Sequence, residues 1–295
     1  MDIVLIPAYY RPEFLALCLE HLSKTEGSRD DKQYWIMQDY RYDDDMRYGM
    51  QARWTKEVVE KSPLPVRFLQ RKPHGFAGNS HNVLEAYKEA YQTSARLVYL
   101  VEEDVLVTPD FFHWHEFVQV VEPKTMCSIA YRCSRNNEAY RDITDPTSYF
   151  TTARDYASIG VCWKRENLGP VLQHACPEYY ADQEGYIRRT FPGNRFAGDF
   201  CEQDGLVMRV MWEQRAFTTW PYVPRAYHLG GYGYHRPAGK RPDGQLQTKI
   251  NTLREWVRNA DILKTVAPDF GDIEPYDDTL NQRLITSLTR EQHFK

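Results

Sequence analysis

The segment that most constrains this chain is residues 97–112, which read LVYLVEEDVLVTPDFF. Residues 97–101 predict a buried strand, because β-branched and aromatic residues dominate them. Three consecutive acids, Glu102, Glu103 and Asp104, follow directly. Carboxylates grouped at the end of a buried strand are costly to desolvate and repel one another. A divalent cation with a phosphorylated ligand would offset that cost, and a solvated strand end is the alternative that this segment leaves open.

The first half of the chain alternates between strand and helix patterns. Strands are predicted at residues 3–6, 34–38 and 66–69, and helices begin near Pro12 and near Gln51. This alternation indicates a parallel sheet covered by helices on both faces, so the predicted fold class is α/β. After the acids, Pro109 predicts the first turn of another helix, with Thr108 as its N-cap.

Three polar features follow predicted strands of this sheet. They are Asp39 after the second strand, the basic loop at residues 71–80 (RKPHGFAGNS) after the third, and the acidic triplet after the fourth. In an open α/β sheet, ligands bind outside the carboxyl ends of the strands, so the three features are expected to converge. The loop leads into a helix N-terminus, which favours anions. It matches neither of the common phosphate-binding patterns, so a plain turn stays open, as it does for Asp39.

The second half combines short strands with a further pair of acids. Strands are predicted at residues 126–131, 158–163 and 218–223, and Glu202 and Asp204 precede an apolar helical pattern. Residues 224–235 are rich in glycine and aromatic side chains, which predicts a loop. The basic, Pro- and Gly-containing stretch that follows predicts a flexible segment, and residues 250–257 carry the apolar stripe of a terminal helix.

Composition places the chain among ordinary globular proteins and excludes several classes. Its 295 residues are 42% hydrophobic with a net charge of −4, so nothing draws the whole chain toward nucleic acid. No basic leader opens the sequence and no run approaches the ~20 apolar residues of a membrane span. The six cysteines form no C-x-x-C pair, which favours reduced thiols over a thiolate zinc site. We therefore expect a cytoplasmic protein.

Two stretches resemble nucleotide-sugar glycosyltransferases of the GT-A fold, including family 2 glycosyltransferases. The opening strand followed by PAYYRPEFLALCLEHL resembles the start of such domains. VEEDVLVTPDFF closely resembles the metal-binding segment of the Golgi N-acetylglucosaminyltransferase I group. The chain departs from that group in having Glu103 in place of the middle aspartate, and we expect it to lack the membrane anchor of the Golgi enzymes.

The resemblance implies a Rossmann-like, mixed and mainly parallel sheet in a catalytic domain at residues 1–235. Residues 1–122 would form the nucleotide-sugar half and residues 123–235 the acceptor half. Residues 236–295 would form a flexible basic loop and a helical C-terminal extension.

The resemblance also implies roles for individual residues. Asp104 would bind the metal, with His228 as a second ligand or a diphosphate contact. Asp39 would contact the base or ribose, Glu103 would lie near the sugar or ribose, and Asp204 would be the general base, with Glu202 as the other candidate. Further candidates for the donor site are Pro7, Tyr9, Arg11, Gly78, Asn82 and Glu102. From the residues alone, His228 can also be a packed histidine, Asp204 an N-cap and Arg11 a surface ion-pair partner.

The predicted activity is an inverting, metal-dependent transfer from a nucleotide sugar, expected to be a UDP-sugar, with Mn²⁺ or Mg²⁺ as cofactor. A metal stabilises the leaving diphosphate, and a separate carboxylate takes the proton of the attacking hydroxyl. One alternative is a sugar-phosphate nucleotidyltransferase, although residues 7–13 (PAYYRPE) lack the glycine-rich signature of that class. Another is a non-catalytic sugar- or nucleotide-binding module. The acceptor stays open between a glycan and a hydroxymethylated DNA base, as in bacteriophage DNA modification, which would leave the base stack to react.

Overall fold

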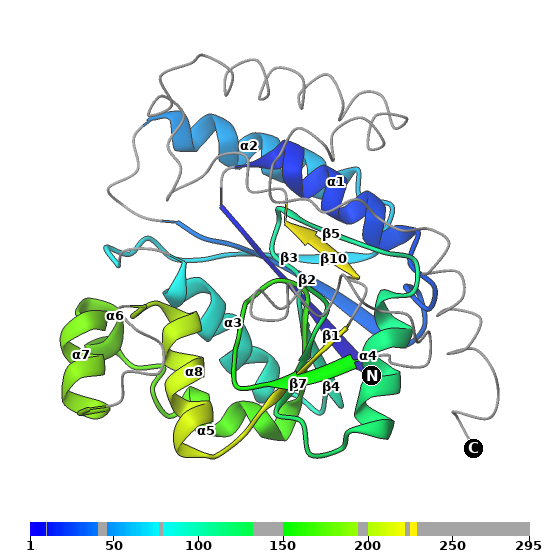
Figure 1. The fold of residues 1–295 in the computed structure, drawn as a ribbon. Coiled ribbons are helices and arrows are strands. Elements are labelled where there is room, and N and C mark those ends of the chain that lie inside the picture. Colours follow the sequence, from blue (N-terminus) through cyan, green and yellow to red (C-terminus); the bar gives the residue numbers. More distant parts are fainter. Residues whose placement is uncertain are drawn as a thin grey trace, which may run out of the picture.

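The computed structural model describes residues 1–9, 11–40, 46–76, 79–131, 150–193, 200–221 and 225–228. Within them, helices flank a central sheet on both faces (Figure 1). The strands are β1 (Asp2–Ala8), β2 (Lys32–Gln38), β3 (Val66–Gln70), β4 (Leu97–Leu100), β5 (Val105–Val107), β6 (Cys127–Ile129), β7 (Phe150–Ala153), β8 (Val161–Lys164), β9 (Thr218–Pro221) and β10 (Ala226–His228). The helices are α1 (Pro12–Ser23), α2 (Met46–Glu60), α3 (Ser80–Tyr91), α4 (Phe111–Val121), α5 (Gly169–Leu172), α6 (Pro177–Ala181), α7 (Gln183–Thr190) and α8 (Gln203–Glu213), with a 3₁₀ turn, η3, at Arg165–Leu168.

The main sheet has the strand order β3-β2-β1-β4-β8-β6-β9-β7. The pairings from β3 to β4 are parallel, as is the β6–β9 pairing. Strand β8 is antiparallel to both of its neighbours, and β7 is antiparallel to β9. The predicted α/β class, with a mixed and mainly parallel sheet, is confirmed by this topology.

Side chains along the strands alternate between the two faces of the sheet, and this divides the core into two layers. Along β1, Ile3 and Leu5 join one apolar cluster while Val4 and Ile6 join the other, because successive side chains point to opposite faces of a sheet. The first cluster lies under α3, α5 and α8, and the second lies under α1 and α4 (Figure 1). Helix α2 packs beside α1. Burial on both faces explains why the strands read as continuous apolar runs.

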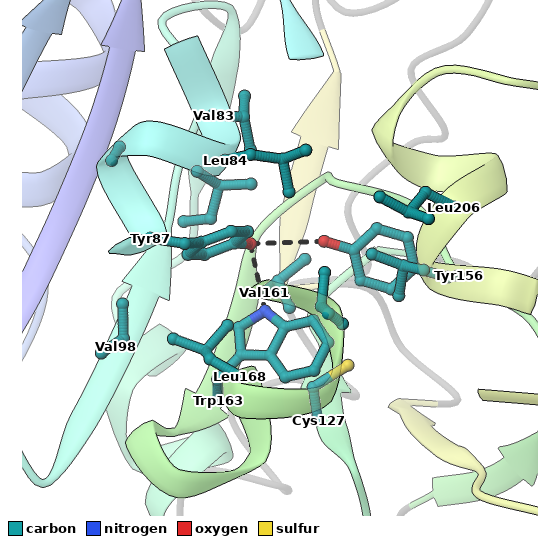
Figure 2. Close-up of a cluster of buried hydrophobic side chains, with 14 of the residues drawn as sticks. Val83, Leu84, Tyr87, Val98, Cys127, Tyr156, Val161, Trp163, Leu168 and Leu206 are labelled. Carbon is teal, nitrogen blue, oxygen red and sulfur yellow. Dashed lines mark hydrogen bonds between the residues drawn. The ribbon is translucent and has the colours of Figure 1, made fainter. Parts of the chain in front are cut away.

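Three aromatic side chains in the first cluster satisfy one another's polar atoms (Figure 2). The indole Nε1 of Trp163 donates to the hydroxyl of Tyr87 at 3.0 Å, and that hydroxyl lies 3.3 Å from the hydroxyl of Tyr156. Buried Tyr and Trp require such partners, because an unpaired polar group in an apolar cluster is costly. The network therefore fixes Tyr156, two residues before the buried Ser158, against the core.

A small second sheet joins segments that are far apart in the sequence. Strand β10 pairs antiparallel with β5, with His228 opposite Val105. Gly160 permits this arrangement, because a Cβ added there would lie 2.8 Å from the Cβ of Ala226. Its φ of +63° is also one that favours glycine. The pairing carries His228 to the end of the strand–acid segment.

Several sequence predictions differ from the structure. Thr108 is not the N-cap of the following helix, which begins at Phe111 with Asp110 in the capping position. The Thr108 hydroxyl instead donates to the Asp110 carboxylate at 2.5 Å, and this contact competes with capping. Residues 226–228 form a strand although the segment around them predicted a loop. The region of the predicted basic loop and C-terminal helical extension, residues 236–295, lies outside the described residues, and the two-part division of residues 1–235 stays a prediction.

The described part of the chain bears on two sequence predictions, the absence of a membrane span and the reduced state of the cysteines. No helix there is both long enough and apolar enough to cross a bilayer. The five cysteines described are all free, and Cys18, Cys127 and Cys162 are buried.

Candidate active site

The polar features that follow β2, β3 and β4 meet at the carboxyl ends of the parallel strands. The Glu103 N–H donates to the Pro7 carbonyl at 3.2 Å, and the Asp39 N–H donates to the Ala8 carbonyl at 2.8 Å. The Arg71 N–H, which follows β3, donates to the Gln38 carbonyl at 2.9 Å. The predicted convergence is therefore observed, and it arises because parallel strands end at the same edge of the sheet.

Arg11 binds two of the three consecutive acids. Its Nε lies 2.6 Å from Glu103 Oε1 and its Nη1 lies 2.7 Å from Asp104 Oδ2. The second oxygen of Glu103 accepts the Tyr9 backbone N–H at 3.0 Å. Glu103 thus holds Tyr9 and Arg11 against the strand end, and its predicted position near the sugar or ribose stays a prediction. Arg11 is an ion-pair partner inside the site, not on an open surface, since its side chain is only 16% exposed.

Asp104 is the acid that also meets a histidine from the far end of the described chain. His228 Nε2 lies 3.2 Å from Asp104 Oδ2, which β10 makes possible by pairing with β5. Burial alone would raise the pKa of Asp104, but the attraction of Arg11 and His228 outweighs burial and lowers it. Burial likewise opposes the charged form of His228, and the Asp104 carboxylate more than compensates, so the pKa of His228 is raised.

Two buried carboxylate oxygens at this strand end have no hydrogen-bond partner among the described residues. They are Asp104 Oδ1 and Glu102 Oε1. An unsatisfied buried carboxylate oxygen is costly unless a cation or a donor from a ligand completes it. Carboxylate oxygens beside one imidazole form a donor set that suits Mn²⁺ or Mg²⁺. The residues present therefore fit the predicted divalent cation.

Glu102 interacts electrostatically both with Asp104 in this cluster and with Asp204, an acid in the first turn of α8. Burial, then Asp104 and Asp204, raise the pKa of Glu102 to about 8. Burial also raises the pKa of Asp204 to about 7, with hydrogen bonds from the backbone and hydroxyl of Ser158 opposing the rise and nearby Glu202 adding to it. A carboxyl group with a pKa near 7 can accept a proton at neutral pH and release it again.

The structure also separates the two acids that the sequence left as alternatives. Asp204 lies in the first turn of α8 and interacts with Ser158 and Glu102. Glu202 occupies the N-cap position, and its side chain makes no capping hydrogen bond. Asp204 is therefore not the N-cap, and it is the better placed of the two toward the strand-end acids.

Asp39 is paired with a histidine that the sequence did not single out. His74 Nε2 lies 2.7 Å from Asp39 Oδ1, and the His74 N–H donates to the Tyr40 carbonyl at 3.2 Å. Both side chains are buried. His81, in the first turn of α3, lies beside them. The signal that could have found these histidines was their position in and after the loop that follows β3.

Two residues that were predicted to contact the donor, Asn82 and Pro7, make hydrogen bonds within the protein. Asn82 donates from Nδ2 to the Met37 carbonyl at 2.8 Å and accepts Arg71 Nε at Oδ1 at 3.0 Å. It thereby ties the loop after β3 to β2, and its contact with a donor stays a prediction. Pro7 contributes its carbonyl to Glu103, as described above. Gly78 lies outside the described residues. Ser158, by contrast, was predicted only as the first residue of a strand.

Solved structures with a similar chain course are glycosyltransferases, at low sequence identity. The mannosyltransferase PcManGT from Pyrobaculum calidifontis, in complex with GDP-Man and Mn²⁺, matches at TM-score 0.43 and 11% identity over 99% of this chain and 80% of that one. TarS 1–349 from S. aureus in complex with UDP-GlcNAc matches at TM-score 0.47 and 13% identity over 100% and 74%. Mouse xyloside xylosyltransferase 1 matches at TM-score 0.41 and 10% identity over 74% and 83%.

No protein-family model matches the sequence, and no curated protein matches it either. Because the TM-scores of these structures lie between 0.41 and 0.47, the likeness assigns no activity to this chain.

Proposed function

We propose that this chain is a metal-dependent glycosyltransferase that moves a sugar from a nucleotide sugar to a hydroxyl group. The observation that carries the proposal is the interaction of the acids at the end of β4 with a second acidic group at the start of α8. The first of these groups contains Asp104, with an unpartnered buried oxygen beside Arg11 and His228. The other is Asp204, whose pKa is raised to about 7. A purely structural acidic cluster would satisfy its buried oxygens internally and would not require the second carboxyl group.

The first cluster has the groups needed for the donor. Asp104, with His228 beside it, would hold Mn²⁺ or Mg²⁺. When bound, such a cation supplies Lewis-acid stabilisation of the charge that develops on the leaving nucleoside diphosphate. Arg11 lowers the pKa of Asp104, so Asp104 is ionised at neutral pH and can act as a cation ligand. Asp39, at the end of β2, would accept a hydrogen bond from the base or the ribose, and His74 fixes the orientation of its carboxylate.

The second cluster would activate the acceptor. The ionised carboxylate of Asp204 would take the proton of the attacking hydroxyl, and the proton would remain on Asp204 until product leaves. Ser158 hydrogen-bonds to Asp204 and orients it. With one cluster for the leaving group and a separate one for the nucleophile, a single displacement follows, and the sugar inverts at its anomeric carbon. We propose a UDP-sugar as donor, on the resemblance of residues 101–112 to a metal-binding segment of UDP-sugar enzymes.

The acceptor is proposed only as a hydroxyl-bearing molecule. A glycan requires nothing beyond the second cluster. A hydroxymethylated DNA base was suggested by the basic stretch at residues 235–245, which lies outside the described residues. The salt dependence of duplex binding separates these acceptors, because contacts to phosphates weaken steeply as salt is added.

Thermal shift with a panel of nucleotides tests the donor site. UDP, GDP, CDP and dTDP are each added with Mn²⁺, Mg²⁺ or EDTA. A nucleotide at about 100 times its Kd stabilises the fold by about 2.7 kcal/mol, so the correct one should raise the Tm by several degrees. The rise should require the metal and should vanish in Asp104→Asn.

Asp30→Asn is the matched control, because Asp30 is an exposed acid just before β2, whose opposite end carries the site. It should retain the full shift. If no nucleotide stabilises the wild-type protein with any metal, the acids are structural and the proposal is wrong. Stabilisation by a nucleoside triphosphate in preference to all diphosphates would favour a nucleotidyltransferase.

A further inference from the structure

A second group of metal-ligating side chains lies at the same sheet edge, outside the Asp104 cluster. Asp39, His74 and His81 each offer one ligand atom, and these atoms lie within 4.8 Å of one another. We propose that these three residues form a second cation site, selective for Zn²⁺ or another ion that prefers imidazole, and that its occupancy inhibits donor binding. The inhibitory part rests on the proposed function, whereas the cation site itself does not.

The site is held by the fold before any ion binds. Asp39 and His74 are 4% and 7% exposed, and His74 Nε2 lies 2.7 Å from Asp39 Oδ1. His81 is fixed by rings on three sides, with centroid distances of 4.2 Å to His74, 5.0 Å to Phe76 and 4.9 Å to Tyr180. Ligand side chains whose rotamers are already fixed by packing lose little conformational entropy when they bind a metal.

His81 supplies the independent sign of a missing ligand. Its Nδ1 is buried and has no hydrogen-bond partner among the described residues. Burial, with a smaller contribution from His74, lowers the pKa of His81 to about 4, so the ring is neutral at pH 7. A neutral imidazole with an unused ring nitrogen is the form that binds transition metals.

The donor set differs in chemistry from that around Asp104. Two imidazoles and one carboxylate suit Zn²⁺, Cu²⁺, Ni²⁺ or Fe²⁺, whereas sites dominated by oxygen suit Mg²⁺ and Mn²⁺. Three protein ligands also leave one position of a tetrahedral Zn²⁺ open for water or a ligand group. A pocket of about 750 Å³, lined by residues 74–76 and 180–184, reaches one of the three ligands, His74.

Ion uptake must change the tautomer of His74. The Phe76 N–H donates to His74 Nδ1 at 3.2 Å, so Nε2 carries the proton that bridges to Asp39. An ion bound at Nε2 replaces that proton, and the ring then carries its hydrogen on Nδ1 and loses the Phe76 contact. Because the neutral ring carries one hydrogen before and after this change, binding at His74 is a change of tautomer without net release of a proton.

The cation site is tested by calorimetric titration of the full-length, metal-free protein with ZnCl₂. One Zn²⁺ per chain should bind. His81→Gln, which leaves the buried pair intact, should raise the Kd at least ~10-fold. His74→Gln serves as a second variant, and circular dichroism confirms that both fold. His113→Gln, a half-buried histidine on α4, is the matched control and should bind as the wild type does.

Asp104→Asn separates the two cation sites. It should retain Zn²⁺ binding, and Co²⁺ bound in its place should give the absorption of a low-coordinate site in wild type and Asp104→Asn but not in His81→Gln. Unchanged Zn²⁺ affinity in His81→Gln, or loss of binding in Asp104→Asn, would overturn the proposal.

Competition tests the consequence for the donor. At fixed Mn²⁺, Zn²⁺ should weaken binding of the nucleoside diphosphate that raises the Tm of the wild type. It should not weaken that binding in His81→Gln. Zinc binding without competition would refute the inhibitory role. Zinc binding in a protein that binds no nucleotide would instead refute the proposed function and leave the cation site standing.

Discussion

At the scale of single residues, Asp204 is the group on which the proposed chemistry depends most. Its side chain remains partly exposed, so an acceptor can reach it, yet burial by the surrounding protein raises its pKa to about 7. Ser158 donates hydrogen bonds to it from a buried position that Tyr156 and the core network fix. A general base is most effective when its pKa lies near the working pH, and Asp204 meets that condition.

The pH dependence of transfer should report this carboxyl group. A base must be ionised to act, so kcat/KM should rise with pH through about 7 and level off above it. Asp204→Asn should lower kcat by about 10²- to 10⁴-fold and remove that rise. Glu202→Gln should keep both the rate and the rise. A profile that is unchanged in Asp204→Asn, or that is lost in Glu202→Gln, would assign the base to Glu202.

At the scale of elements, the small β5–β10 sheet determines whether His228 reaches Asp104. Strand β10 is anchored by the buried Arg225, whose Nε lies 3.1 Å from Asp110 Oδ2. The backbone N–H of Arg225 also donates to the Ala130 carbonyl at 2.7 Å. The turn at Gly160 passes close beneath the strand. A residue that is remote from the site in sequence is thus positioned by contacts that involve no ligand.

Substitution of Gly160 should test this support. Gly160→Ala combines a left-handed φ, which costs about 1–2 kcal/mol for a residue with a Cβ, with a 2.8 Å approach to the Ala226 Cβ. Overpacking of this kind costs a further ~1–3 kcal/mol. Gly193→Ala is the matched control, since its φ of +77° is equally left-handed but nothing lies within 4 Å of the added Cβ.

Chemical denaturation measures both variants. Gly193→Ala should show only the conformational cost, and Gly160→Ala should show both costs together with weaker metal-dependent nucleotide binding. Equal free energies of unfolding for the two variants would mean that the strand does not depend on this contact.

The elements that sequence could predict are those whose signals are local. Strand β1 and helix α1 follow from an apolar run and from Pro12 at a helix start, and the acids after β4 are visible without any partner. Strands β5 and β10 have three residues each and are defined by pairing across more than a hundred positions, which no local pattern encodes. The N-cap at Asp110 was missed because the Thr108 hydroxyl has a different partner.

The residues of the candidate site also divide into those with a local sequence signal and those that depend on tertiary contacts. Asp104 and Asp204 could be predicted because grouped carboxylates are conspicuous in the sequence. His74 lies in the loop that the sequence indicated, but its pairing with Asp39 could not be predicted, because that hydrogen bond joins two strand ends. Ser158 could not, because a serine beside an apolar run carries no signal until its partners are known. Their environments, and hence their pKa values, depend on tertiary burial, which no local sequence pattern encodes.

At the scale of the whole molecule, the two acidic clusters are carried by one sheet and by helix α8, which packs on it. Strands β1 to β4 supply the edge that holds Asp104, and β6, β8 and β9 continue the same sheet toward the region of α8 and Asp204. Helices on both faces bury that sheet (Figure 1). The two clusters therefore belong to one packed unit, which would keep leaving group and nucleophile in a fixed relation during a single displacement.

The measurement that tests this division of labour most directly compares donor binding with turnover in two variants. Nucleoside diphosphate release from the stabilising nucleotide sugar is followed with Mn²⁺ and a series of hydroxyl acceptors, including water. Asp104→Asn should lose both donor binding and release, whereas Asp204→Asn should bind the donor as the wild type does and release the diphosphate about 10²- to 10⁴-fold more slowly. Equal turnover in wild type and Asp204→Asn, or no turnover of any nucleotide sugar, would contradict the account.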